Sequence, residues 1–179
     1  VEFKQADKDY KTSEIGRDFS ALANEANLRG AESGWLIFGV NNKSRTVVGT
    51  NYRPDTEQLN GLKHQMAQGT EPSITFRAIH ELHHADGRVL LFEIPAAPRG
   101  MPVAWQGHFY ARAGESLTSL GLDKQDGIRN QTLAQDWTAQ LVSGATLDDL
   151  DDEAVNKARE SFAKKYANRV SVEAVMGWP

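Results

Sequence analysis

The chain of 179 residues contains no cysteine. Disulfides, thiolate metal sites and thiol nucleophiles are therefore excluded from its chemistry. No apolar run approaches the roughly 20 residues that a membrane-spanning helix needs, and the N-terminal residues lack the basic and then apolar pattern of a signal peptide. We therefore expect a cytoplasmic protein that does not associate with membranes.

An excess of positive charge is also missing. The net charge is −4, and residues 1–120 hold 13 Lys and Arg against 14 Asp and Glu. Because nucleic-acid-binding domains usually carry a basic footprint, bulk charge argues against that function unless the cations gather on one face. The sequence has no P-loop spacing either. We therefore expect no cofactor in this chain.

Apolar residues at three- and four-residue spacing predict two helices. The first begins at Thr12 or Ser13 and ends near Gly30, and the second covers residues 56–68. The stripes that we expect to be buried are Ile15, Phe19, Leu22 and Ala26 in the first helix and Leu59, Leu62 and Met66 in the second.

Short apolar segments predict strands at 1–5, 35–40, 46–48, 74–82, 89–94 and 108–112. We expect segment 35–40 to be a central strand buried on both faces, with 46–48 returning beside it as a hairpin. Asp86-Gly87 predicts a second hairpin turn. Together these patterns favour an α+β fold, a two-layer sandwich of a mixed, largely antiparallel sheet with packed helices.

The pattern changes after residue 120. The acidic run 148–153 predicts the start of a solvated helix that continues to about residue 167, because carboxylates are favourable at a helix N-terminus. We therefore divide the chain into a first domain at 1–120 and a helical connector at 121–179. The first residue is Val and the chain ends after a polar helix, so we expect a fragment of a longer protein.

Four short segments occur in a characteristic order: Val1-Glu2-Phe3-Lys4, Ala-Leu-Ala-Asn at 21–24, the run from Gly34 to Val40, and the run from Phe109 to Ser116. In order and spacing they resemble the Schlafen AlbA-type DNA-binding domain over roughly residues 1–120. The resemblance implies nucleic acid as the partner, in a bacterial regulatory or defence protein whose further modules often bind ATP. Its structural motif positions are Glu2, Asn24, Gly34, Gly39 and Gly114.

Glu2 and Lys4 share one face of the first strand, because successive strand residues alternate faces. They could face a phosphate and its metal, or form a charged sheet edge. Tyr110 and Arg112 likewise share a strand face, so that a ring could stack on a base while the guanidinium binds a phosphate. The alternative is a structural role, in which Arg112 lies on an ordinary strand and pairs with an acidic neighbour such as Glu2. Arg17 and Lys43 join this candidate surface if the fold brings their segments together.

Two other polar groups invite simpler explanations. We expect Asn24 to bridge helix and strand backbone, because a buried amide needs hydrogen-bond partners. The family's Gly-Gly junction after this residue is expanded here to 25–33, and we expect this departure to extend the helix by a turn. His80, His83 and His84 lie on a predicted strand, where His83 points away from the other two, so we expect no metal site there.

Our leading hypothesis is a non-catalytic nucleic-acid-binding domain, most simply for DNA, that uses Lys4, Arg17, Lys43, Tyr110 and Arg112. A second is a metal-dependent endoribonuclease of Schlafen type. The resemblance implies three metal-binding acids there, of which Glu2 is present, while the position after the Gly-Val strand holds Asn41 and Asn42. A third is a homo-oligomerisation or protein-interaction module that uses a sheet edge or the aromatics Trp105 and Trp178.

Overall fold

The computed structural model describes residues 1–8, 10–114, 116–131, 146 and 149–166. Its first compact unit, residues 1–136, contains a mixed four-stranded sheet with the order β1-β2-β5-β4. These strands are β1 (Glu2–Lys4), β2 (Ser33–Phe38), β5 (Gly87–Pro95) and β4 (Ala78–His84). β1 runs parallel to β2, and the other neighbours are antiparallel.

Two helices cover one face of this sheet, α1 (Thr12–Leu28) and α2 (Thr56–Gly69). All seven residues of the two predicted stripes are buried. They pack against alternate residues of the central strands, such as Leu36 and Phe92, both with no exposed surface. The main core therefore lies between the sheet and these helices.

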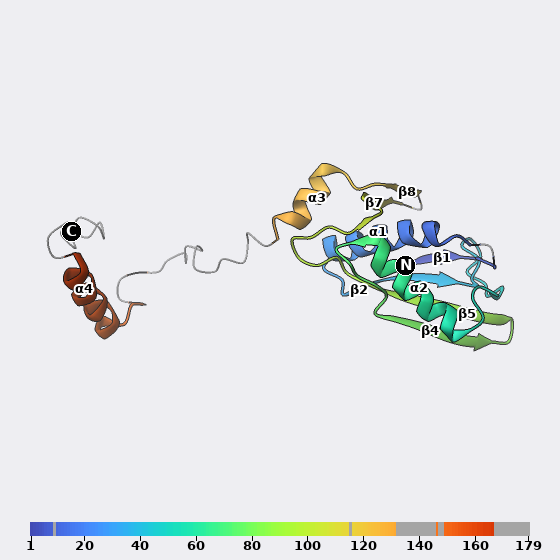
Figure 1. Ribbon diagram of the computed structural model, residues 1–179, viewed down its shortest axis with the longest axis horizontal. Coiled ribbons are helices and arrows are strands. Elements are labelled where there is room, and N and C mark those ends of the chain that lie inside the picture. The colour runs from blue at the N-terminus through green and yellow to red at the C-terminus, as the bar shows by residue number, and fades with distance from the viewer. Residues whose placement is uncertain (9, 115, 132–145, 147–148, 167–179) are drawn as a thin grey trace. The chain divides into compact units, whose positions relative to one another are not determined.

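A second four-stranded sheet lies on the other side of α1, with the order β3-β6-β7-β8. Its strands are β3 (Thr70–Glu71), β6 (Ala104–Trp105), β7 (His108–Ala113) and β8 (Ser116–Ser119). Figure 1 shows α1 lying between β1 and β2 on one side and β7 and β8 on the other. The fold is α+β, as predicted. The separate second sheet was not predicted.

Small residues on α1 let this second sheet approach closely. A Cβ atom built on Gly16 would lie 2.1 Å from the ring of Trp105, so only glycine leaves room for the indole. On the opposite side, a Cβ on Gly34 of β2 would lie 2.9 Å from the Cβ of Leu22. Glycines thus set the separation of the helix from both sheets.

The first compact unit also includes residues after 120. Helix α3 (Leu122–Arg129) packs on it through Ile128, which is fully buried in a small cluster with Ala111 and Leu120. The second unit, residues 137–179, contributes α4 (Asp152–Tyr166). As expected, α4 begins within the acidic run, and Asp151 accepts a hydrogen bond from the Ala154 amide at its start. None of the described helices combines the length and apolarity needed to cross a membrane.

Three expectations from the sequence need correction. The central strand is buried on one face only, since Leu36 and Phe38 are buried while Trp35 and Ile37 are half-buried. Segment 46–48 forms no strand, and a single bridge between Val40 and Val47 replaces the predicted hairpin. Gly39 follows β2 directly and has a φ of 87°, in the left-handed region, so the extended strand conformation ends there.

The third correction concerns Trp105, which was a candidate contact residue for self-association. Its side chain lies between Gly16 and Gly69, and only 5% of the residue is exposed. It therefore cannot serve as a surface contact. The other candidate aromatic, Trp178, falls outside the described residues.

Candidate nucleic-acid interface

Four charged side chains from three elements meet beside the core. Glu2 and Lys4 come from β1, Asp18 from α1 and Arg112 from β7. Arg112 binds Glu2 at 2.5 Å and Asp18 at 3.5 Å, and Lys4 binds Glu2 at 2.9 Å and Asp18 at 3.7 Å. We call these four residues the ion-pair cluster. It contains two carboxylates and two cations, so it is balanced in charge.

The ion-pair cluster is largely withdrawn from solvent. The side chains of Asp18, Arg112 and Glu2 are 5%, 10% and 11% exposed, and that of Lys4 is 28% exposed. Burial and the neighbouring Glu2 carboxylate raise the pKa of Asp18, while Lys4, Arg112 and a hydrogen bond from Tyr10 oppose that rise. The Tyr10 hydroxyl donates this bond at 3.2 Å, and burial followed by the charge of Asp18 raises the pKa of Tyr10.

This arrangement changes the role of two predicted contact residues. Lys4 and Arg112 do come together, but each is bound to both carboxylates. Arg112 cannot turn to a phosphate without leaving two buried carboxylates with Lys4 as their only cationic partner, which is unfavourable. Because their charges are neutralised, these two residues act as a scaffold that joins β1, α1 and β7.

The other predicted contact residues lie elsewhere. Arg17 is half-buried on α1, where its Nε donates to the Ser13 carbonyl at 3.4 Å. Lys43 is exposed in the loop that follows β2. Tyr110 is half-buried, and its ring packs against the main core. Among the described residues, no hydrogen bond or ion pair joins the side chain of Arg17 or Lys43 to the ion-pair cluster.

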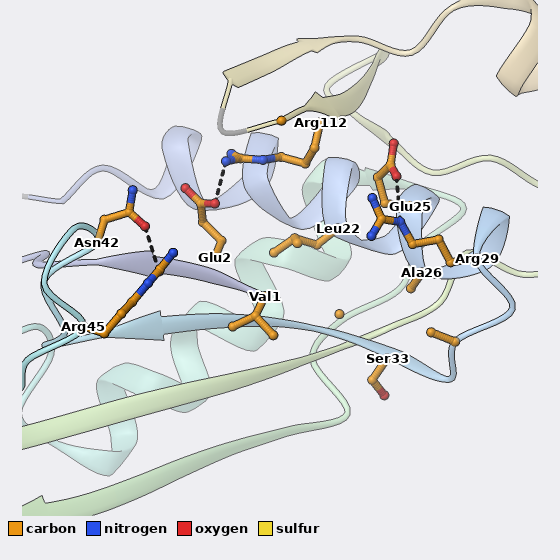
Figure 2. A pocket seen from close by; sticks show the side chains of 13 residues that line it. Val1, Glu2, Leu22, Glu25, Ala26, Arg29, Ser33, Asn42, Arg45 and Arg112 are labelled. Atoms are coloured by element: carbon orange, nitrogen blue, oxygen red, sulfur yellow. Dashed lines mark hydrogen bonds and ion pairs between the residues drawn. The ribbon is translucent and has the colours of Figure 1, made fainter.

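An open pocket of about 310 Å³ lies beside the ion-pair cluster. Three arginines from separate elements line it: Arg29 from the end of α1, Arg45 from the loop after β2, and Arg112 from β7. We call it the arginine pocket. Figure 2 shows Arg29 and Arg45 at opposite ends of it, with Glu2 and Arg112 between them.

Arg45 differs from the other two arginines of this pocket. Its guanidinium lies 4.3 Å from the centre of the Phe3 ring and donates to the Asn42 side chain at 3.0 Å. Within the described part of the chain it makes no ion pair with a carboxylate, whereas Arg29 binds Glu25 and Arg112 binds Glu2. Arg45 is therefore an exposed cation, held in place by a ring and an amide, whose charge is not neutralised by an ion pair.

The pocket also brings together Glu2 and Asn42, two positions at which the family resemblance implies metal-binding acids. The donor set does not fit a divalent metal. Both oxygens of Glu2 are bound by cations, and the other pocket carboxylate, Glu25, binds Lys124 at 2.8 Å and Arg29 at 3.3 Å. Asn42 adds no charge to offset a dication. Over the described ranges, no group of three His, Cys, Asp or Glu residues could hold a metal ion.

A polar ladder on α1 fixes the second sheet against this site. Ser20 donates to the Val103 carbonyl at 2.8 Å and accepts from the Tyr110 amide at 3.1 Å. Asn24 donates to the carbonyls of Val103 and Tyr110 at 2.9 and 3.1 Å and accepts from the Val103 amide at 2.8 Å. Asn24 thus bridges the helix to the 103–110 backbone.

Sequence reasoning missed Asp18, Ser20, Arg29 and Arg45. Asp18 and Ser20 lie directly beside the buried Phe19, and polar residues within a buried helix segment are a signal that they have partners. Arg45 lies two residues after Lys43 and gave no signal of its own. Its importance comes from the ring of Phe3, which only the fold brings near.

Comparison with known proteins agrees with this architecture. A family model described as Schlafen, AlbA_2 matches residues 1–121. The chain belongs to this Schlafen AlbA_2 family. No curated protein matches the chain.

Among solved structures, the DIP2311 protein from Corynebacterium diphtheriae is similar, with a TM-score of 0.51 and 17% identity over 95% of this chain and 30% of that one. The chain thus spans less than a third of that protein. The N-terminal domain of a Nitrosomonas europaea protein described as related to the ATP-dependent DNA helicase RecG has 21% identity, a TM-score of 0.42, and coverage of 68% and 82%. At these identities the DIP2311 match supports the fold alone.

Proposed function

We propose that this Schlafen AlbA_2 domain binds nucleic acid without cleaving it, and that the phosphate backbone passes along the arginine pocket. Lys43 and Arg45 make the main phosphate contacts, and Arg29 contributes at the other end of the pocket. Family membership supports nucleic acid as the partner. The observation that carries the residue assignment is the exposed Arg45 guanidinium, which is oriented by Phe3 and has no ion pair in the described chain.

The ion-pair cluster has a supporting role in this proposal. It fixes β1 and β7 against α1, so the wall of the pocket stays rigid when a polyanion approaches. Preorganised cations lose less entropy on binding, which favours affinity. Of the predicted phosphate contacts, Lys43 therefore remains a contact in this proposal. Lys4 and Arg112 instead stabilise the structure beside the pocket.

The wider setting is part of the same proposal. We place the domain in a cytoplasmic bacterial regulatory or defence protein, with DNA as the first partner to test. ATP binding belongs to other modules of such proteins. Because Trp105 is buried, it no longer supports the hypothesis of self-association.

The experiment measures the affinity of the protein for duplex DNA and duplex RNA by fluorescence anisotropy between about 50 and 200 mM salt. Each lost phosphate contact reduces the log–log salt slope by about 1. The double variant Lys43→Gln/Arg45→Gln should therefore lower affinity and flatten the slope by about 2. The matched control Lys63→Gln/Arg99→Gln removes the same charge from positions outside both the pocket and the loop that carries Lys43 and Arg45, and should retain the steeper slope.

Three results would contradict the proposal. The wild-type protein could fail to bind either duplex at the lowest salt concentration. The two double variants could lose affinity equally, which would reduce the effect to net charge. Cleavage of structured RNA in the presence of Mn²⁺, abolished by Glu2→Gln, would instead support the endoribonuclease hypothesis.

A further inference from the structure

A second pocket, of about 350 Å³, lies where the start of α1 meets the end of α2. We call it the tryptophan pocket. Uncharged side chains and one glycine line it: Thr12, Ser13, Gln65, Gln68, Gly69, Trp105 and Gln106. Its volume lies near the lower end of the range for small-molecule sites.

The start of α1 supplies backbone donors to this pocket. The amides of Thr12 and Ser13 make no hydrogen bond within the described chain, whereas those of Glu14 and Ile15 bond to the Lys11 carbonyl. Free amides in the first turn and the positive end of the helix dipole together favour an anion.

A cation lies beside these amides. Arg53 donates to the Thr12 hydroxyl at 3.2 Å, the Gln65 side chain at 2.8 Å and the Gln58 carbonyl at 2.8 Å. All three acceptors are neutral, and the described residues place no carboxylate within 4.0 Å of its guanidinium. A partly buried guanidinium is costly without a negative partner, so the position favours an anionic ligand.

A buried donor that lines the pocket also lacks a partner. The indole N–H of Trp105 makes no hydrogen bond, and the residue is 5% exposed. Buried polar groups are rarely left unpaired, so an unpaired donor at the wall of a pocket points to a ligand.

We propose that the tryptophan pocket binds a nucleotide through its phosphomonoester group. The phosphate lies against the amides of Thr12 and Ser13, where Arg53 and the Thr12 hydroxyl bind its oxygens. The amides of Gln65, Gln68 and Gln106 then face the sugar and base, because a side-chain amide offers both a donor and an acceptor. The ligand is either a free nucleotide or the phosphorylated end of a nucleic acid.

The test follows the backbone amides of Thr12 and Ser13 and the indole N–H of Trp105 by NMR in ¹⁵N-labelled protein. The probes are inorganic phosphate, the four common nucleoside 5′-monophosphates and the matching nucleosides. At least one monophosphate should shift all three signals in a saturable manner, while its nucleoside should not. Arg53→Gln should weaken that binding at least tenfold, and Arg99→Gln, at an exposed arginine outside the pocket, should leave it unchanged.

Because Arg53 also supports the start of α2, a second variant guards against local unfolding. Thr12→Val removes a ligand hydroxyl with little change in shape, and it should weaken nucleotide binding while preserving the melting temperature. Equal binding of nucleoside and nucleotide, no shift at millimolar concentrations, or wild-type affinity in both variants would overturn the proposal.

A further comparison separates the two sources of the phosphate. Affinities of a 5′-phosphorylated and a 5′-hydroxyl oligonucleotide are measured beside that of the mononucleotide. Tighter binding of the phosphorylated oligonucleotide alone identifies a nucleic-acid end, and tighter binding of the mononucleotide identifies a free metabolite. Both results support the site. Failure of this proposal is distinguishable from failure of the proposed function, because the arginine pocket is tested by the salt slope of duplex binding and the tryptophan pocket by nucleotide titrations.

Discussion

Asn24 and Val103 hydrogen-bond to each other in both directions: the side-chain amide donates to the Val103 carbonyl, and the Val103 amide donates to the Asn24 oxygen. Both groups are buried, so water cannot replace either bond. The pair ties the last turns of α1 to the segment that enters β6. It explains an asparagine in the Ala-Leu-Ala-Asn segment by backbone pairing.

Replacing Asn24 by Ala should lower the free energy of unfolding by about 1–3 kcal/mol, because the Val103 amide then loses its partner inside the protein. Urea unfolding measures the change. The matched control is Asn60→Ala, at an exposed position of α2, where we expect a change within about 0.5 kcal/mol. Equal effects at the two positions would show that the buried bonds contribute little.

Two glycine-to-alanine substitutions should have opposite signs. Both Gly16 and Gly61 lie inside helices, where alanine is intrinsically favoured by about 1 kcal/mol. A Cβ at Gly61 meets no atom within 4 Å, so that substitution should stabilise the protein. A Cβ at Gly16 would overlap the Trp105 ring, so Gly16→Ala should destabilise it by about 1–3 kcal/mol.

Urea unfolding of both variants tests this contrast. A stabilised Gly16→Ala protein would mean that the indole of Trp105 moves aside without cost. In that case the wall of the tryptophan pocket is not rigid, and a change in Trp105 fluorescence should accompany the substitution.

Local patterns predicted the elements well, because short-range spacing carries the relevant information. The stripes of α1 and α2 depend on neighbours in sequence, and so does the hairpin turn predicted from Asp86-Gly87, which the structure places one residue earlier, at Ala85-Asp86. The extent of burial of β2 does not depend on neighbours in sequence. Its alternation of buried and half-buried residues depends on whether helices cover one face of the sheet or both, and no local pattern reveals that.

The site was less predictable for the same reason. The Glu2–Arg112 pairing joins residues that are 110 positions apart, and it was only one of two alternatives for Arg112. Asp18 was not singled out, because a single acid on an amphipathic helix is usually exposed. The packing of Arg45 over Phe3 depends on the loop after β2, where the predicted hairpin was wrong.

Removing Arg112 should destabilise the protein, because the buried carboxylates of Glu2 and Asp18 then lose one of their two cations. Arg112→Met leaves Asp18 and Glu2 with only Lys4 to compensate them, so we expect a loss of about 3–5 kcal/mol near pH 7. The pKa of Asp18 is raised in the folded protein, and the folded state therefore binds more protons than the unfolded chain. The contribution of Asp18 to the free energy of unfolding is fully present below pH 3.8, the ordinary pKa of the group. It decreases as the pH rises through the raised pKa of the folded protein.

The loss of unfolding free energy caused by Arg112→Met should consequently be smaller near pH 4 than near pH 7. Urea unfolding at the two pH values measures it, with Arg99→Met as a control that removes an exposed arginine. A deficit independent of pH would assign the effect to lost packing of the arginine stem, and would contradict the electrostatic account of the ion-pair cluster.

Lys4→Met distinguishes a scaffold lysine from a phosphate contact. Lys4 is the strongest of the influences that lower the pKa of Asp18, so its removal should raise that pKa further. Carboxyl ¹³C NMR titration of Asp18 measures the change, and Lys63→Met serves as the matched control. In the same preparation, duplex DNA affinity should fall less than in Lys43→Gln/Arg45→Gln, because Lys4 is already bound to two carboxylates. A large loss of affinity with an unchanged Asp18 pKa would return Lys4 to the binding surface.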